Sequence, residues 1–283
     1  MADEKGHDVL IQVQLRTRGS LRLMVTTCDS PPLRVVFPKS GLKNTVFAGE
    51  DSLKLVPHCN NNAPYEQYLL REFLAYKIFG LFTPRSYRVR LAKGSYLDAA
   101  SGKPVASRYA FFVESNEDVA RRMEGRIAEI KGQRFAGQDD DTLVLMAMLQ
   151  WMVGNTDYSI SALHNIRLVQ LQDGLRYPIA YDFDSAGLVD APYAGPDKRL
   201  GINTTRDRLF RGPCRPMEKY EVFLAKFREK KGELMALIDA VPGFTESSRK
   251  DARSYMEEFY STISNPGRAK RAMLDSCLKS TRM

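Results

Sequence analysis

The stretch 154-GNTDYSISALHN-165 places an aspartate and two asparagines between two regular elements. Before it lies the unbroken apolar run 142-TLVLMAMLQWMV-153, which predicts a buried helix. After it comes 166-IRLVQL-171, which predicts a strand. Polar residues at such a junction can cap a helix, form a turn, or hold a metal ion and a substrate. The surrounding sequence has to decide among these.

A second polar cluster follows in 178-PIAYDFDSAGLVDAPYA-194, where an apolar strand ends in Asp182 and Asp184. A carboxylate at the end of a buried strand is costly unless it is paired, hydrogen-bonded or bound to a metal. Together with Asp157 and Asn165, the two clusters offer three carboxylates and an amide. Oxygen ligands of this kind suit Mg²⁺ or Mn²⁺, which commonly reach a protein through few carboxylates plus substrate phosphates.

Outward from these clusters, the periodicity predicts an α+β chain with a β-rich half that has one main helix, then a helical half with an inserted strand pair. The halves are residues 1–115 and 116–283, and the family resemblance given below implies that they are an antiparallel-sheet lobe and a mainly helical lobe. Strands are expected at 9–15, 31–37, 53–59, 86–92, 108–114, 166–171 and 178–183. Helices are expected at 65–82, 116–131, 142–153, 217–240 and 245–264.

The order of polar residues along the chain is typical of a phosphoryl-transfer site. Such a site needs an Asp that orients the nucleophilic hydroxyl, and an amide and a carboxylate that hold metal. It also needs a cation on an early strand that contacts the nucleotide phosphates. The chain offers, in order, Lys54 on a strand, Glu66 or Glu72 on the next helix, then Asp157, Asn165 and Asp182.

At this point the sequence resembles a known family, the CotH-like atypical protein kinases, and more distantly the HipA and phosphoinositide-kinase-like groups. The matching pieces span about two thirds of the chain and occur in the family's order. The resemblance implies a two-lobed protein-kinase-like fold that binds ATP and Mg²⁺ (or Mn²⁺) in its cleft. The pieces are 53-LKLV-56, 70-LREFLAYKIF-79, 111-FFVE-114, 154-GNTDYSISALHN-165 and 179-IAYDFD-184.

Carried over by position, the resemblance makes Asp157 the catalytic aspartate and Asn165 a metal ligand. Asp182 takes the place of the metal-binding aspartate that follows the last short strand, and Asp184 is either a second ligand or a cap. Asp157 and Asn165 are eight positions apart, whereas ordinary protein kinases have about five.

The resemblance also assigns the nucleotide contacts. Lys54 would contact phosphate and pair with Glu72. The backbone of Glu114, Ser115 and Asn116 would form the hinge that meets adenine.

The early turn departs from the kinase pattern because it lacks a GxGxxG loop. Its Gly19 is flanked by arginines, whose forked guanidinium groups match phosphate oxygens. We therefore expect arginine side chains to share the phosphate contacts with Lys54. The candidates are Arg16, Arg18 and Arg22.

Two other functions stay open. The missing glycine-rich loop allows a pseudokinase that binds a nucleotide or a partner protein without efficient catalysis. A metal-dependent phosphohydrolase would use Asp157, Asp182 and Asp184 and would need neither Lys54 nor the hinge. In an active kinase the acceptor would be a hydroxyl of a protein or of a small metabolite.

Structural roles remain possible for several of these residues. Asp157 could cap a turn, and Lys54 could be a surface lysine on an alternating strand. His164 is expected to be a packing or turn histidine rather than a base. The aromatic residues of the main helix are expected in the core; they are Tyr65, Tyr68, Phe73, Tyr76 and Phe79.

Composition narrows the partners. The 283 residues are 43% hydrophobic and 27% charged, typical of a globular protein, and no apolar run reaches the length of a membrane span. The net charge is +8, and from Arg199 onward 18 Lys and Arg stand against 11 Asp and Glu. No nucleic-acid motif accompanies this charge, so a solvated basic surface is expected rather than a nucleic-acid partner. We expect a monomer without membrane contact.

The four cysteines bear on the compartment. Cys28 with Cys59, and Cys214 with Cys277, could form two disulfides within separate halves of the chain. That pairing, with a signal peptide removed, would indicate a secreted or periplasmic protein. Four reduced thiols would indicate the cytoplasm. The start MADEKGHDVL does not itself read as a signal peptide.

Overall fold

The computed structural model describes residues 9–18, 28–132 and 135–279, and its backbone packing divides the chain into two units. Unit 1 contains the described residues of Met1–Leu69 together with Val89–Ser115. Unit 2 contains Leu70–Arg88 and the described residues of Asn116–Met283. The main helix α2 (Ala63–Phe82) is therefore shared, with its residues from Leu70 onward in unit 2.

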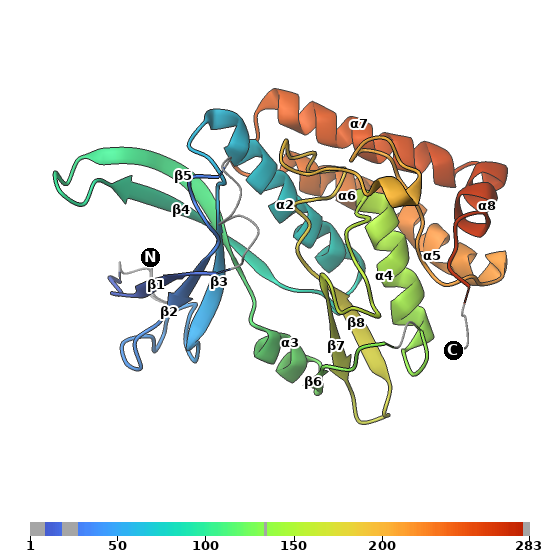
Figure 1. Ribbon diagram of the computed structural model, residues 1–283, viewed down its shortest axis with the longest axis horizontal. Coiled ribbons are helices and arrows are strands. Elements are labelled where there is room, and N and C mark those ends of the chain that lie inside the picture. Colours follow the sequence, from blue (N-terminus) through green and yellow to red (C-terminus); the bar gives the residue numbers. More distant parts are fainter. Residues whose placement is uncertain (1–8, 19–27, 133–134, 280–283) are drawn as a thin grey trace. The chain divides into compact units, whose positions relative to one another are not determined.

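Unit 1 is an antiparallel sheet of five strands in the order β1-β2-β3-β5-β4. In Figure 1 the β4–β5 hairpin extends well past the other three strands. Its strands are β1 (Gln14–Thr17), β2 (Leu33–Val36), β3 (Ser52–Pro57), β4 (Val89–Leu97) and β5 (Pro104–Val113).

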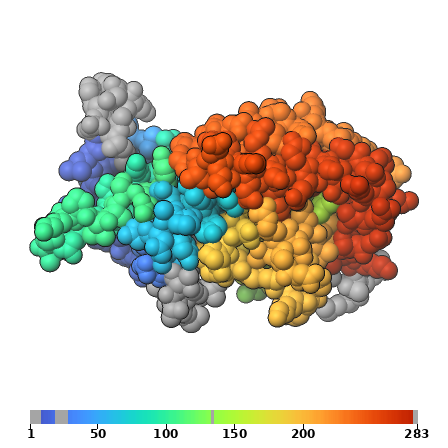
Figure 2. Space-filling view, turned by 90° about the horizontal axis from the view of Figure 1, so that it is seen from above, coloured from blue at the N-terminus to red at the C-terminus, as the bar shows by residue number. Residues whose placement is uncertain are grey.

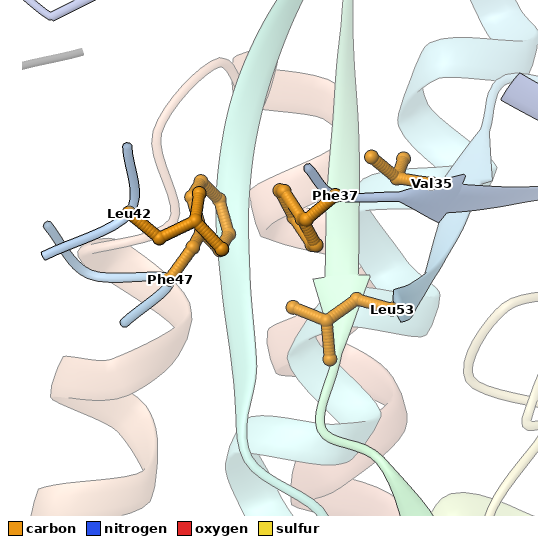
Figure 3. Packing of buried hydrophobic residues seen from close by; sticks show 5 residues of the cluster. All are labelled: Val35, Phe37, Leu42, Phe47 and Leu53. Atoms are coloured by element: carbon orange, nitrogen blue, oxygen red, sulfur yellow. The ribbon is translucent and has the colours of Figure 1, made fainter. Parts of the chain in front are cut away.

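One face of this sheet carries a cluster of buried hydrophobic residues. Val35 and Leu53 are paired across β2 and β3, and they pack with side chains from the connection between these strands. Figure 3 shows Phe37, Leu42 and Phe47 from that connection gathered around them. Because strand side chains alternate between faces, the residues between these apolar positions point to the opposite face. Lys54 is one of those residues.

Unit 2 holds a small antiparallel sheet in the order β6-β7-β8 and most of the helices. The strands are β6 (Arg126–Ala128), β7 (Ile166–Gln170) and β8 (Arg176–Ala180). The helices are α3 (Asn116–Arg122), α4 (Asp140–Val153), α5 (Met217–Glu229), α6 (Lys231–Asp239), α7 (Glu246–Ile263) and α8 (Pro266–Leu274). Residues 184–216 link β8 to α5 and run beside α7 at the surface (Figure 2).

Helix α4 places the quoted loop. Asp139 caps its first turn by accepting a hydrogen bond from the Thr142 amide, and Thr142–Val153 are all buried. The helix ends at Gly154, whose φ of 69° is the left-handed conformation that glycine adopts at low cost. A Cβ there would lie 1.9 Å from the Tyr255 hydroxyl. Both the backbone angle and the packing therefore require glycine where the loop begins.

The predicted α+β fold is confirmed, with an antiparallel sheet and one main helix followed by a mainly helical part. Several local predictions were wrong. The strand expected at 9–15 lies at Gln14–Thr17, and the helix expected at 217–240 is split at Lys230. Helix α8 was not predicted, and the strand pair of unit 2 has a third member, β6.

The helix expected at 116–131 ends at Arg122 because the chain then turns sharply into β6. Glu124 has a φ of 56°, and Gly125 passes so close to β7 that a Cβ would meet the Gln170 carbonyl oxygen at 2.6 Å. Charged periodicity alone does not report such a close approach.

Each unit contains one disulfide, Cys28–Cys59 in unit 1 and Cys214–Cys277 in unit 2, with Cα atoms 4.6 and 4.9 Å apart. Within the described ranges, no helix is long and apolar enough to cross a membrane.

Candidate active site

The loop that follows α4 is closed by its own hydrogen bonds. The Asn155 amide donates to the Gln150 carbonyl, and the Asn155 side-chain oxygen accepts from the Asp157 amide at 3.0 Å. Further along, Ser159 and His164 exchange two backbone hydrogen bonds of 2.9 Å. Residues 160–163 therefore form the tip of a small turn, and Asp157 and His164 lie on its two sides.

The Asp157 carboxylate is held by two side chains from the end of this loop. His164 Nε2 lies 2.8 Å from Oδ1, and Asn165 Nδ2 lies 3.2 Å from Oδ2. Since an ionised carboxylate only accepts, the His164 nitrogen that faces it carries the hydrogen. The Asp157 side chain is 46% exposed. It is therefore accessible to a substrate while the two contacts orient it.

Asn165 is buried and has a φ of 52°, a conformation that asparagine tolerates better than most residues. Its Nδ2 donates to the Asp157 carbonyl oxygen at 2.8 Å and also faces the Asp157 carboxylate. Both partners are acceptors, so the amide nitrogen must be the atom that faces them. This orientation leaves Oδ1 as the atom that can bind a cation.

Asp182 lies at the same end of the β7–β8 hairpin as Asn165. The strand register pairs Ile166 with Ala180, and the Tyr181 amide donates to the Asn165 carbonyl. Asp182 is therefore one residue beyond the partner of Asn165. Its φ is 64°, and its amide donates to the Tyr76 hydroxyl on α2 at 2.9 Å.

Glu72 and Asp182 both lie near the Tyr76 hydroxyl. Burial raises the pKa of the Tyr76 hydroxyl well above its ordinary value, and the nearby Glu72 and Asp182 carboxylates raise it further. Tyr76 therefore stays protonated. Glu72 is itself only 2% exposed. Phe183, next to Asp182, packs against the rings of Tyr76 and Phe79 with centroids 4.7 Å away in both cases.

Asp184 lies two residues after Asp182, at the start of the turns that cover the end of α4. Its Oδ1 is 3.4 Å from the Ser185 hydroxyl. The Gly187 amide donates to the Gly154 carbonyl, and the Leu188 amide donates to that of Val153. The segment after β8 is thereby fixed to the beginning of the Asp157 loop.

Arg211 supports the Asp157 loop from the segment before α5. Its Nη1 donates to the carbonyl oxygens of Thr156 and Tyr158, the two residues that flank Asp157. Its guanidinium carbon also lies 5.3 Å from the centroid of the Tyr158 ring. One cation thus holds both peptide groups on either side of the predicted catalytic residue.

The three residues predicted to bind a metal ion offer oxygen donors of the chemical type that Mg²⁺ takes. No group of three or more His, Cys, Asp or Glu side chains placed to hold a metal exists in the described part of the chain. The set formed by Asn165 with Asp182 and Asp184 is an amide with two carboxylates. Such a set suits an ion that takes its remaining ligands from water and phosphate oxygens.

The predicted nucleotide residues of unit 1 lie on or next to strands of the same sheet. Lys54 is on β3 and is paired with Val113 of β5, the residue that precedes Glu114. Arg16 is on β1, and Arg18 follows that strand, with its amide donating to the Pro32 carbonyl. Arg22 and Gly19 lie outside the described residues.

The remaining predicted positions lie around the end of β5 and the start of α2. Ser115 directly follows Glu114. Asn116 begins α3, and its Oδ1 accepts a hydrogen bond from the Tyr87 hydroxyl at 2.7 Å. Glu66, the alternative to Glu72, accepts a hydrogen bond from the Tyr109 amide of β5.

His164 lies in a turn and Tyr76 in the core, as expected, but their contacts with Asp157 and Asp182 were not predicted. Arg211 was not singled out. The alternation of polar residues in the loop could have suggested His164, since it immediately precedes Asn165. Tyr76 and Arg211 reach the site from 106 and 53 or more residues away, and no local pattern reports that.

No family model matches the chain, and no curated protein sequence matches it. Among solved structures it is similar to the crystal structure of a Helicobacter pylori proinflammatory kinase, CtkA. The two share 9% sequence identity with a TM-score of 0.46, and the similarity covers 94% of each chain. At that score the likeness carries no argument about function, so the roles proposed below rest on the contacts of the residues themselves.

Proposed function

We propose that this chain is a phosphotransferase that uses ATP with Mg²⁺ (or Mn²⁺) and phosphorylates a hydroxyl of a protein or a small molecule. The observation that carries the proposal is the orientation of Asn165. Its amide nitrogen is occupied by Asp157, and its oxygen is left at the hairpin end where Asp182 follows. This orientation supports a base at Asp157 beside a metal-binding pair at Asn165 and Asp182, the parts that phosphoryl transfer requires.

In the proposed reaction the acceptor hydroxyl oxygen forms a bond to the γ-phosphorus of ATP. The bond between that phosphorus and the oxygen bridging to the β-phosphorus breaks, and ADP leaves. The hydroxyl proton passes to the Asp157 carboxylate, which is accessible and held by His164 and Asn165. A positioned group of this kind contributes roughly 10²–10⁴-fold to the rate.

Asn165 Oδ1 and the Asp182 carboxylate would hold the divalent ion, with Asp184 as a further ligand. When bound, the ion supplies charge neutralisation on the β- and γ-phosphate oxygens. Lys54 would contact phosphate from unit 1, and the backbone of Glu114, Ser115 and Asn116 would meet the adenine. Glu72, buried beside Tyr76 and Asp182, would keep its kinase-type role as the acidic residue of the main helix.

The experiment that tests the function is a melting series with Mg²⁺ alone, ATP alone and both, followed by an ADP-release assay with and without candidate hydroxyl acceptors. Ligands that bind the folded state raise the melting temperature. A kinase should show a joint effect of metal and ATP larger than the two separate effects, together with ADP release that an acceptor increases.

Other results would exclude the proposal. Binding of ATP without ADP release in any condition would indicate a pseudokinase. Metal-dependent phosphate release from simple phosphate esters, without any ATP binding, would indicate a phosphohydrolase built on the same aspartates.

We also propose that the protein works in an oxidising compartment, as a secreted or periplasmic protein. The support is the pairing of all four cysteines in two disulfides, one in each unit. Closing loops of 31 and 63 residues should each stabilise the fold by about 4 kcal/mol in the chain-entropy account. Mass spectrometry of the native protein without reduction should find no free thiol; four free thiols would contradict it.

A further inference from the structure

Unit 1 contains a row of three cations that the strand register brings together. Arg16 on β1 is directly opposite Arg34 on β2, and Arg34 is directly opposite Lys54 on β3. Side chains of directly opposed residues in antiparallel strands lie on the same face of the sheet. Arg16, Arg34 and Lys54, here called the cation row, are therefore neighbours on one face, although they come from three separate parts of the sequence.

The cation row lies on the face of the sheet opposite the cluster formed around Val35 and Leu53. The next residues along the three strands, Leu15, Val35 and Leu53, are also opposed to one another. Val35 and Leu53 belong to the core cluster of unit 1 (Figure 3). Since alternate residues point to opposite faces, the cation row points away from that cluster.

Like charges placed directly opposite each other destabilise a sheet. The contacts of the two arginines do not relieve this. Arg34 donates to the Ser52 hydroxyl at 3.0 Å, and Arg16 Nη2 lies 3.4 Å from the Gln14 side-chain oxygen. Neither arginine forms an ion pair with a carboxylate anywhere in the described ranges. Their fixed charges are thus left available for an external anion.

We propose that the cation row binds the polyphosphate chain of the nucleotide, with Arg34 as a phosphate-binding residue beside Lys54 and Arg16. This deepens the proposed function and rests on it. Neighbouring strands are about 4.8 Å apart, so three successive cations extend over roughly 10 Å. A row of that length suits several phosphate groups in a line better than a single one. Arginine forks can hold phosphate oxygens with two hydrogen bonds at once.

The cation row would also supply the phosphate contacts that a glycine-rich loop makes in other kinases. In a glycine-rich loop, backbone amides contact the phosphates, and this chain has no such loop. The guanidinium groups of Arg16 on β1 and Arg34 on β2 would take the place of those amides. The sequence analysis found Arg16 and Lys54 but passed over Arg34, because only the strand register shows that it lies between them.

The test compares Arg34→Met and Arg16→Met with a matched control, Arg90→Met. Arg90 is on β4 of the same sheet, opposite Phe112, whereas Lys54 is opposite Val113. Arg90 therefore points to the other face. Pyrophosphate, ATP and AMP are titrated into the full chain by calorimetry, and melting curves without ligand check folding.

The expected result is that each substitution in the row weakens pyrophosphate and ATP binding by roughly tenfold, the loss of a bidentate phosphate contact. AMP binding should change less than about twofold, and Arg90→Met should leave all three affinities unchanged. Without ligand, Arg34→Met should melt at or above the parental temperature, because it removes repulsion.

Three results would overturn the cation row. The first is an equal loss of AMP and ATP affinity in the Arg34 variant. The second is an equal effect of Arg90→Met. The third is failure of the parent to bind pyrophosphate. The proposed function fails differently: if the parent binds pyrophosphate through Arg34 but never transfers a phosphoryl group, the row stands and the kinase assignment falls.

Discussion

Asp157 and Asp182 are both tied to the same end of the β7–β8 hairpin, but the contacts differ. Asp157 is held at its backbone and also at its carboxylate, which His164 and Asn165 contact at 2.8 and 3.2 Å. Asp182 is fixed through its backbone, which has a φ of 64° and donates its amide to Tyr76.

The difference matches the two proposed tasks. A group that takes a proton must keep one carboxylate geometry while remaining accessible, so restraint of the side chain is useful. For a metal ligand, a fixed backbone sets the direction in which the carboxylate leaves the chain. Substitutions at Asp157 and its side-chain partners should therefore lower turnover. Substitutions at Asp182 and its backbone partner should lower metal-dependent affinity for ATP.

The largest effect is expected for Asp157→Asn. The amide keeps the size of the side chain but cannot accept the hydroxyl proton, so turnover should fall by roughly 10²–10⁴. Affinity for ATP with Mg²⁺ should stay within about twofold, because Asp157 is not assigned to nucleotide or metal. Steady-state ADP release and calorimetric titration of the same preparation measure the two quantities. Unchanged turnover would remove Asp157 from the chemistry.

The next effect concerns Asp182 and needs a careful choice of substitution. Alanine at a φ of 64° is strained by about 1–2 kcal/mol, so Asp182→Ala would lower stability and metal binding together. Asparagine tolerates this conformation. Asp182→Asn should therefore fold normally and lose roughly 10²-fold in affinity for ATP in the presence of Mg²⁺, the scale of losing a preorganised electrostatic contact.

The measurement for Asp182→Asn is titration with ATP in Mg²⁺ and in excess chelator. Affinity in the chelator should equal that of the parent, since the carboxylate acts through the metal. If the variant and the parent bind ATP equally well with Mg²⁺ present, Asp182 is not a metal ligand.

The sequence predicted much of this region because its signals are local. The apolar run before Gly154 indicates helix α4, and the alternation after Asn165 indicates β7. The positive φ angles at Asn165 and Asp182 fall on residue types enriched in that conformation. Polar residues at the junctions therefore marked the loop and the strand end before any packing was known.

The sequence could not predict the restraints that come from distant elements. Tyr76 reads as one more aromatic of a helix with apolar periodicity, and only the fold brings its hydroxyl to the Asp182 amide. Arg34 reads as the polar residue of an alternating strand until the register places it between Arg16 and Lys54. Gly125 reads as an ordinary helix residue until its approach to β7 is known.

His164 offers a smaller and sharper test of side-chain restraint. His164→Leu removes the hydrogen bond to Asp157 Oδ1 and should lower turnover roughly tenfold, the scale of one charge-assisted hydrogen bond. His164→Gln should recover most of this loss, because its amide nitrogen is as many bonds from Cα as the histidine Nε2. Affinity for ATP should be unchanged in both variants.

A double variant and a loop control separate positioning from general damage to the loop. In an Asp157→Asn background, His164→Leu should lower turnover no further if His164 acts only through Asp157. Ser161→Ala changes the same loop away from Asp157, since its hydroxyl contacts that of Ser159, and should leave turnover near the parental value. Equal losses in His164→Gln and His164→Leu would show that the ring packs the loop and does not orient the carboxylate.

The smallest effect is expected where the restraint on Asp182 is loosened from the α2 side. Tyr76→Phe keeps the ring packed on Phe183 but removes the oxygen that accepts the Asp182 amide. An amide left without its partner should lower the free energy of unfolding by about 1 kcal/mol. The backbone at Asp182 would then sample other angles, and affinity for ATP with Mg²⁺ should fall about fivefold, the binding equivalent of that energy.

The matched control for this change is Tyr260→Phe on α7. Tyr260 is also buried, but its hydroxyl makes no hydrogen bond within the described part of the chain. Its removal should therefore leave stability unchanged or slightly higher. Denaturant melts and ATP titrations with and without Mg²⁺ measure both variants. If Tyr76→Phe is as harmless as Tyr260→Phe, the backbone of Asp182 keeps its left-handed angle without help. The restraint would then lie in the Phe183 packing against α2.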